Sequence, residues 1–198
     1  MFLSAFAFSA VSAFFMVNVE MPSWAYIVSG ISILIFAAPS FWALRRWLGW
    51  RDSLFLLGVL SVFALSVEGF AVVKGFPYGS FSYSELLGFR LFGVVPWTVA
   101  FAWTPLILAA YAISHRLIEN VFVRILSAAL ILIAFDLVLD PGAVYMGFWK
   151  YSAGGSYYGV PFSNFAGWLL SGIAGAGIVE IMVRRFKPLL PTPAQLIL

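Results

Sequence analysis

The sequence contains no cysteine and only one histidine, His115, among its 198 residues. The lack of cysteine excludes disulfides, thiolate metal sites and a cysteine nucleophile. A single histidine cannot assemble the multi-histidine sites that hold haem or a di-iron centre within one chain. Phosphate-binding loops, nucleotide fingerprints and nucleophile elbows are missing as well. We therefore expect neither a bound metal nor an organic cofactor.

Charged residues are also few, at 10% of the chain, whereas hydrophobic residues make up 63%. A soluble domain carries about 25% charged residues. A chain of this length cannot bury so much apolar surface in its own core, so that surface must meet lipid. The composition predicts an all-α, multi-pass integral protein of the cell membrane with a single transmembrane domain over 1–198. The net charge of +3 then reflects orientation in the membrane, and we expect no nucleic-acid partner.

Long apolar segments are what the chain has in abundance. A membrane-spanning helix needs about 20 mostly apolar residues. About six segments meet this requirement: 2–19, 24–44, 53–74, 92–113, 121–140 and 164–183. The first has no basic n-region and no cleavage pattern, so we interpret it as a retained helix. Ser171/Gly175 and Gly172/Ala176 are small-xxx-small pairs in the last, which predicts close packing against another helix.

Basic residues are distributed unevenly between the two ends of these segments. Most would share one side: Arg45, Arg46, Arg51, Arg116, Arg124, Arg184, Arg185 and Lys187. The other side would carry Lys74, Arg90 and Lys150. The positive-inside rule then places both termini in the cytoplasm and the loops 75–91 and 141–163 outside.

Polar groups are concentrated in the outer half of the expected bundle, at Glu68, Asp136, Asp140 and Asn164. Asp136 and Asp140 are at positions i and i+4, so they project from one helix face. A carboxylate in lipid costs about 2.5–3.5 kcal/mol on insertion scales, which predicts that the pair points into the bundle or a wet cavity. Close carboxylates also separate their proton affinities, which suits acid–base chemistry. The structural alternative is that Asp140 caps the loop, while Asp136 and Glu68 pair with cations such as Lys74, Arg90 or Lys150.

Aromatic residues gather on the same side of the expected bundle. Those that we assign to substrate binding, together with Asn164, are Tyr78, Tyr83, Trp97, Trp103, Tyr145, Trp149, Tyr158 and Trp168, and Tyr151 and Tyr157 belong to the same cluster. An interfacial belt explains most of them. The sharper interpretation is a π-rich pocket that grips a polyene or stabilises a cation. The remaining acidic residues, Glu20, Asp52, Glu119 and Glu180, are expected to be solvated or to cap helix ends.

Two ordered sets of residues resemble the two halves of a family motif. The first is Glu68-Gly69, Gly75-Phe76-Pro77-Tyr78-Gly79-Ser80-Phe81-Ser82-Tyr83, Leu87-Gly88 and Val95-Pro96 with Trp103. The second is Asp136-Leu137-Val138-Leu139-Asp140-Pro141, Gly147-Phe148-Trp149, Tyr157-Tyr158-Gly159-Val160-Pro161 and Asn164-Phe165-Ala166-Gly167-Trp168. Together, over about residues 60–170, they resemble the membrane carotenoid biosynthesis family. That family includes bisanhydrobacterioruberin hydratases and carotenoid 1,2-hydratases (1′-hydroxylases).

The resemblance implies a cofactor-independent hydro-lyase. Such an enzyme adds water across a terminal isopropylidene double bond of an acyclic C40 or C50 carotenoid such as lycopene. The reaction places a proton on C2, forms a tertiary cation at C1 and adds water to give a tertiary alcohol. The implied partners are a lipid-soluble polyene that enters from the bilayer between helices, membrane lipid, and other carotenoid enzymes.

Hydration of this kind assigns roles to the catalytic candidates Asp136, Asp140 and Glu68. Asp140 is expected at the end of its helix, beside Pro141, and should be the wetter of the two aspartates. Asp136 lies one turn deeper, about 6 Å along the axis, where loss of water favours the neutral acid. We expect Asp136 to hold and deliver the proton, while Asp140 or Glu68 stays ionised and positions water. Glu68 could exchange roles with Asp136, and Asn164 would hydrogen-bond the water or the carboxylates.

Two other functions fit the composition. Paired carboxylates in a membrane also make proton relays, so a proton-coupled small-solute transporter is one alternative. A non-catalytic accessory membrane subunit is the other. A transporter needs a continuous polar path, whereas the cytoplasmic halves of the expected helices carry almost no polar groups. Polarity on one side only favours an enzyme or a binding site.

Overall fold

The computed structural model describes residues 11, 18–19, 25–186 and 188–189. Nearly all of the expected helix at 2–19, as well as Lys187, lies outside the described residues. The described part forms the helices α2 (Ala25–Leu48), α3 (Trp50–Lys74), α4 (Val99–Leu117), α5 (Val121–Tyr145) and α6 (Phe162–Arg185). The connections contain short elements: β1 (Phe81–Tyr83), the 3₁₀ helix η1 (Glu85–Leu87), β2 (Arg90–Leu91), β3 (Val95–Pro96) and β4 (Trp149–Tyr151).

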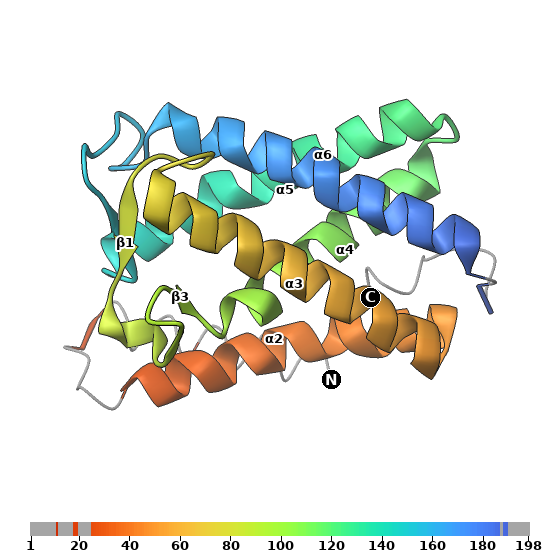
Figure 1. The fold of residues 1–198 in the computed structure, drawn as a ribbon, viewed down its shortest axis with the longest axis horizontal. Coiled ribbons are helices and arrows are strands. Elements are labelled where there is room, and N and C mark those ends of the chain that lie inside the picture. Colours follow the sequence, from red (N-terminus) through yellow and green to blue (C-terminus); the bar gives the residue numbers. More distant parts are fainter. Residues whose placement is uncertain (1–10, 12–17, 20–24, 187, 190–198) are drawn as a thin grey trace.

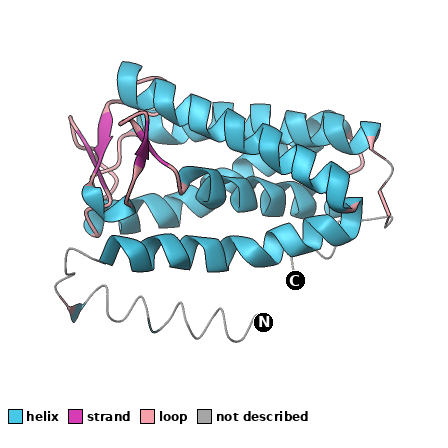
Figure 2. Cartoon of the chain, turned by 60° about the horizontal axis from the view of Figure 1, so that its bottom comes forward, coloured by secondary structure: helices cyan, strands magenta, loops and turns pink. Residues whose placement is uncertain are grey.

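Helix α4 is the centre of the bundle, because it packs against α2, α3, α5 and α6. Ile107, Leu108 and Tyr111 on this helix are completely buried. Helices α5 and α6 lie along each other on one side of α4, and α2 covers another side (Figure 1). The strands cluster at a single end of the bundle, as Figure 2 shows. We call this the loop end, since the connections 75–98 and 146–161 both lie there.

Four of the helices, α2, α3, α5 and α6, are long and apolar enough to cross a membrane. They expose large apolar side chains, such as Val62, Val138 and Ile181, which are 65%, 75% and 63% exposed. Lipid is the solvent that would cover such surfaces. Helix α4 is enclosed by its neighbours, so its sequence can include Thr104, Pro105 and His115. The chain is thus an all-helical membrane protein, while six spans and cytoplasmic termini stay predictions.

Helix α4 begins later than the expected segment 92–113, and that boundary was wrong. Residues 92–98 instead make a turn that pairs β2 with β3. Phe92 and Gly93 have φ values of 52° and 70°, a left-handed conformation that a right-handed helix does not contain. The apolar run therefore begins as a turn and strand and becomes a helix only at Val99.

Helix α5 continues past the expected end at Asp140 and reaches Tyr145, with Pro141 inside it. A proline has no backbone N–H, so the carbonyl of residue i−4 loses its helical donor. That carbonyl belongs to Leu137, and it accepts a hydrogen bond of 3.2 Å from the Tyr157 hydroxyl. A side chain from the following connection thus replaces the missing donor. As a result, Asp140 lies within the helix rather than at its end.

The two connections at the loop end are joined by an antiparallel pairing of β1 with β4, in which Phe81 faces Tyr151 and Tyr83 faces Trp149. Helix α6 approaches this connection closely, because a Cβ added at Gly167 would lie 2.8 Å from the backbone of Pro77. Strand residues are thereby held over the ends of α3, α5 and α6.

Gly172 and Gly175 of α6 pack against neighbouring helices, as the small-residue pairs predicted. A Cβ added at Gly172 would lie 3.1 Å from Cα of Ala129 on α5, and one at Gly175 would lie 2.5 Å from the Trp103 ring on α4. Such close approaches leave no room for a side chain. The small residues therefore fix how closely α6 contacts α4 and α5.

Candidate functional site

Two helices bring carboxyl groups to the loop end of the bundle, and a third brings an amide. Glu68 lies near the end of α3, Asp136 and Asp140 lie on one face of α5, and Asn164 lies in the first turn of α6. Their exposed fractions are 8%, 0%, 2% and 1%. Burying a carboxyl group is unfavourable unless it gains hydrogen bonds. The surrounding donors are therefore the main feature of the site.

Asn164 links the two aspartates of α5. Its Nδ2 group donates one hydrogen bond of 2.8 Å to Oδ2 of Asp136 and another to Oδ2 of Asp140. The second oxygen of Asp136, Oδ1, is buried and has no partner among the described residues. An amide has two N–H donors, so Asn164 uses both of them on this pair.

Two tyrosines from the paired strands donate to Asp140 and Glu68, and Tyr151 shares its acceptor, Oδ2 of Asp140, with Asn164. The Tyr151 hydroxyl donates to Oδ2 of Asp140 at 2.7 Å, and the Tyr83 hydroxyl donates to Oε2 of Glu68 at 2.9 Å. Burial raises the pKa of both tyrosines well above the ordinary value, and the adjacent carboxylates raise it further. Both hydroxyls therefore remain protonated and stay donors at physiological pH.

A small inner cavity of about 50 Å³ lies between these groups. Its lining consists of Glu68, Tyr78, Phe81, Tyr83, Asp140, Trp149, Tyr151, Asn164 and Trp168. A water molecule needs at least roughly 10–15 Å³ of such space, so the cavity has room for a few waters. It is too small for the end of a polyene while its walls keep this arrangement. Asp136 is not part of the lining and contacts it through Asn164.

Aromatic rings make up most of the walls of the inner cavity. Phe81 lies 5.2 Å from Tyr83 and 5.7 Å from Tyr151, measured between ring centroids, and Tyr83 lies 6.0 Å from Trp149. Tyr83 meets Phe81 and Trp149 edge-on, which is a favourable aromatic arrangement, while Phe81 and Tyr151 are tilted to each other. Ring faces also stabilise a nearby cation. The site thus combines carboxyl groups with a π-rich wall.

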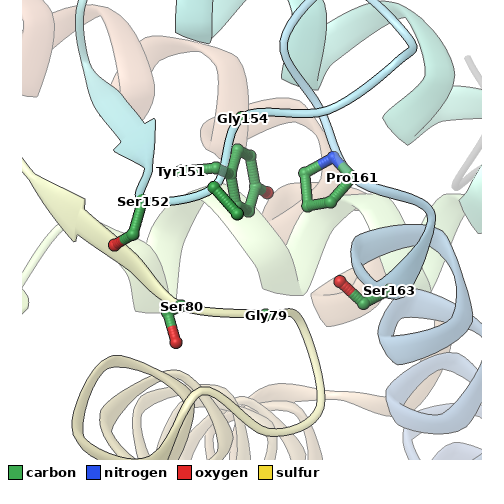
Figure 3. A pocket seen from close by; sticks show the side chains of 8 residues that line it. Gly79, Ser80, Tyr151, Ser152, Gly154, Pro161 and Ser163 are labelled. Atoms are coloured by element: carbon green, nitrogen blue, oxygen red, sulfur yellow. The ribbon is translucent and has the colours of Figure 1, made fainter.

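A larger cleft of about 430 Å³ also has Tyr151 in its lining (Figure 3). It is lined by Gly79, Ser80, Tyr151, Ser152, Ala153, Gly154, Pro161 and Ser163. Tyr151 is the single side chain that belongs to the linings of both spaces.

Eight of the residues predicted for the site lie together here. Seven line the inner cavity, and the eighth, Asp136, accepts a hydrogen bond from one of them, Asn164. The seven are Glu68, Asp140, Tyr78, Tyr83, Trp149, Asn164 and Trp168. Four others lie elsewhere. Tyr145 and Tyr158 are each 76% exposed, Trp97 packs against Phe101, and Trp103 packs against Phe63 in the core.

Phe81 and the specific role of Tyr151 were missed from the sequence. Tyr151 had been counted only as one of a cluster of aromatics. Both residues reach the cavity because β1 and β4 pair, with Phe81 opposite Tyr151. Strands of three residues in Gly-rich loops give little periodic signal. The alternation Phe81-Ser82-Tyr83 is the one sequence pattern that could have indicated this strand.

The expected place of Asp140 at the end of its helix was wrong, because α5 continues beyond it to Tyr145. Both aspartates are buried, with Asp136 0% and Asp140 2% exposed, and Asp140 is the one that lines the inner cavity. Pairing of these carboxyls with nearby cations is not seen either. Among the described residues, Arg90 pairs with Glu85 at 2.7 Å. The donors to the carboxyls are instead neutral hydroxyl and amide groups.

Glu180 was expected to be solvated or to cap a helix, and this too was wrong. It is 4% exposed at the opposite end of the bundle, where Arg124, Arg184 and Tyr111 donate to it. Polar groups are therefore buried at both ends of the bundle. Asn164 and Glu180 are separated by about 24 Å along α6, and apolar residues such as Leu60, Ile107 and Leu132 fill the core.

Metal binding has no obvious place in the part of the chain that the structure describes, where no group of three or more His, Cys, Asp or Glu is arranged to hold an ion. The site's own chemistry is that of carboxyl groups, which can donate and accept protons.

Comparison with known proteins places this geometry in a family context. Residues 23–198 match the family model described as "Carotenoid biosynthesis protein". A bisanhydrobacterioruberin hydratase from Haloarcula japonica is 43% identical over 120 residues, which cover 59% of this chain and 41% of that relative. The match thus spans less than half of the relative's length. No solved structure matches the chain. The chain belongs to the carotenoid biosynthesis protein family.

Proposed function

We propose that this protein is a carotenoid hydratase that adds water across a terminal isopropylidene double bond of an acyclic carotenoid. The observation that carries the proposal is the group of buried carboxyls around a water-sized cavity with aromatic walls. The family membership and the Haloarcula japonica relative named as a hydratase support it. The reaction needs an acid, a base, water and shelter for a cation, and each has a candidate here.

The aspartate pair is the proposed proton source. Asp136 is completely buried and its Oδ1 has no partner among described residues, so the neutral acid suits this environment better than the anion. Because Asn164 holds Oδ2 of both aspartates, we treat the pair as one unit that shares a proton. Asp140 lines the inner cavity and presents that proton to the substrate.

The balanced reaction follows from these positions. The proton moves to C2 of the double bond, whose π electrons form the new C–H bond and leave a tertiary cation at C1. The rings of residues such as Trp149 and Trp168 face that cation across the cavity. A water molecule adds to C1 and gives its extra proton to Asp140, directly or by way of Glu68, so that the aspartate pair regains the proton that it donated. The product is a tertiary alcohol, and the acid is restored.

The substrate's size requires that the site open. A volume of about 50 Å³ accommodates water but no isopropylidene group, so the end of the polyene would displace one or more of the surrounding rings. The polyene itself is lipid-soluble and would come from the bilayer between helices.

The test is conversion of an acyclic carotenoid in a host that makes one. The parent chain should give a more polar product by chromatography. Asp136→Asn and Asp140→Asn keep the side-chain shape but remove the transferable proton, so we expect product to fall by orders of magnitude. Asp52→Asn makes the same chemical change at the opposite end of α3 and should convert normally. Near-parental conversion by both aspartate variants would contradict the carboxyl mechanism.

A further inference from the structure

The cleft at the loop end and the inner cavity are adjacent spaces that share one wall. The cleft holds about 430 Å³ and the cavity about 50 Å³, and Tyr151 lines both. Its side chain is 5% exposed. Tyr151 is therefore the residue at which the carboxyl-lined cavity adjoins the cleft, and Figure 3 shows its ring among the residues that line the cleft.

The cleft is lined mainly by small residues, three of which carry hydroxyl groups. Apart from Tyr151 and Pro161, its residues are glycine, alanine and serine. Ser80, Ser152 and Ser163 line the cleft together with Tyr151 (Figure 3), and all three serines are exposed. Hydroxyl groups both donate to and accept from water. A polyene would gain little by leaving lipid for such a surface.

Tyr151 is held in its closed position by a small number of contacts. Its hydroxyl donates to Asp140 at 2.7 Å, and its ring lies 5.7 Å from that of Phe81. Its strand β4 has only three residues, paired with the three of β1, and Gly154 with a φ of 63° follows closely. The contact with Asp140 ties the ring's position to one of the reacting carboxyls.

We infer that the cleft is the port through which water reaches the buried carboxyls, and that Tyr151 is the positioning residue that closes it. The inference rests on the proposed function, in which water is the second substrate and each turnover consumes one molecule. Two substrates of opposite solubility then arrive by separate routes, the polyene from lipid and water from the loop end. A closed Tyr151 limits the inner cavity to a few waters and keeps bulk water from the cation.

Cysteine accessibility tests the port without relying on activity, because the chain has no cysteine of its own. In Glu68→Cys the only thiol lies in the lining of the inner cavity. A small charged methanethiosulfonate should label it slowly in detergent micelles. Ala64→Cys is the matched control, one turn away on α3, 2% exposed and outside the lining, and it should stay unlabelled.

A second substitution, added to Glu68→Cys, should then either speed or slow labelling, depending on whether it opens or fills the port. Tyr151→Phe keeps the ring but removes the hydrogen bond to Asp140, and this should speed labelling of Glu68→Cys roughly ten- to hundredfold. Tyr151→Ala should speed it further. Ser152→Trp fills the cleft from an exposed position whose backbone N–H bond to Ser80 is retained, and it should slow labelling. The inference would be overturned if Glu68→Cys were labelled at the same rate with and without Tyr151→Phe, Tyr151→Ala or Ser152→Trp. Rapid labelling of Ala64→Cys would overturn it as well.

A lipid-soluble maleimide separates the two routes. If it labels Glu68→Cys quickly while the charged reagent fails even with Tyr151→Ala, access is from the membrane and the port is wrong. Turnover of the Tyr151 and Ser152 variants is measured separately, with Glu68 intact. If labelling follows the predicted order but no variant or parent hydrates a carotenoid, the port stands and the proposed function fails.

Discussion

Asn164→Leu is the change that we expect to harm the site most without altering its volume greatly. Asn164 is 1% exposed and donates both of its amide hydrogens, one to Asp136 and one to Asp140. Leucine has a similar shape but no donor. The two carboxyl oxygens would be left buried without these partners, and the aspartates would lose the group that holds them together.

The magnitude follows from the two lost hydrogen bonds. A hydrogen bond to a charged group contributes roughly 1.5–3 kcal/mol, so losing both should lower the free energy of unfolding by about 3–6 kcal/mol. The lower figure applies if one aspartate is neutral. Asn120→Leu is the matched control, since Asn120 accepts a single N-cap bond from Val123 and its loss should cost about 1 kcal/mol.

The assay has two parts, thermal unfolding in detergent and conversion of an acyclic carotenoid in membranes. We expect Asn164→Leu to unfold at a clearly lower temperature than Asn120→Leu and to lose most of its turnover. Asn164→Asp should also lose turnover, because it adds a third carboxyl to the pair. If Asn164→Leu is as stable and as active as the parent, the aspartates do not act as a linked unit and the reasoning is refuted.

Three further predictions concern the scaffold and are measured by unfolding in detergent. Gly167→Ala should destabilise, because an added Cβ would lie 2.8 Å from loop backbone, whereas Gly177→Ala, with no neighbour within 4 Å, should be neutral or stabilise by up to about 1 kcal/mol. Glu180→Gln should lower the free energy of unfolding by roughly 3–5 kcal/mol, because it breaks a buried charge network. The protein that remains folded should keep its turnover, and loss of turnover in folded Glu180→Gln would contradict this. Tyr157→Phe should lower the free energy of unfolding by about 0.5–1.5 kcal/mol, and by much less in a Pro141→Ala protein, where the backbone donor is restored. An equal loss with Pro141 and with Ala at that position would contradict this explanation.

Most of the helical framework could be predicted from the sequence because the signal is composition over long segments. The apolar runs at 24–44, 53–74, 121–140 and 164–183 correspond to α2, α3, α5 and α6, with ends that shift by a few residues. The common face of Asp136 and Asp140 follows from helical periodicity alone, and both accept from Asn164 in the structure.

The errors at helix ends have local causes that composition does not reveal. Residues 92–98 are apolar enough for a helix, yet a left-handed Phe92 and Gly93 make a turn there. Pro141 is usually a sign that a helix stops, but Tyr157 from a distant turn satisfies the carbonyl it leaves free. Each outcome depends on a contact or a backbone angle, and neither is visible in hydropathy.

Only some of the residues that form the site could be predicted, because tertiary contacts decide which aromatic residues reach the carboxyl groups. Tyr83 and Tyr151 reach carboxyl groups since β1 and β4 pair, while Tyr145 and Tyr158 from the same loops remain exposed. Glu180 is buried because Arg124, 56 residues away in sequence, donates to it from α5. Proximity in sequence does not distinguish these cases.

The central claim, that the chain adds water to a carotenoid double bond, is tested most directly by the source of the product's oxygen. Membranes containing the protein are supplied with an acyclic carotenoid in water enriched in heavy oxygen, and the product is analysed by mass spectrometry. We predict a tertiary alcohol that carries one heavy oxygen atom from water, and no such product from Asp140→Asn. Absence of any hydrated product from the parent chain, or an alcohol whose oxygen comes from molecular oxygen, would contradict the account.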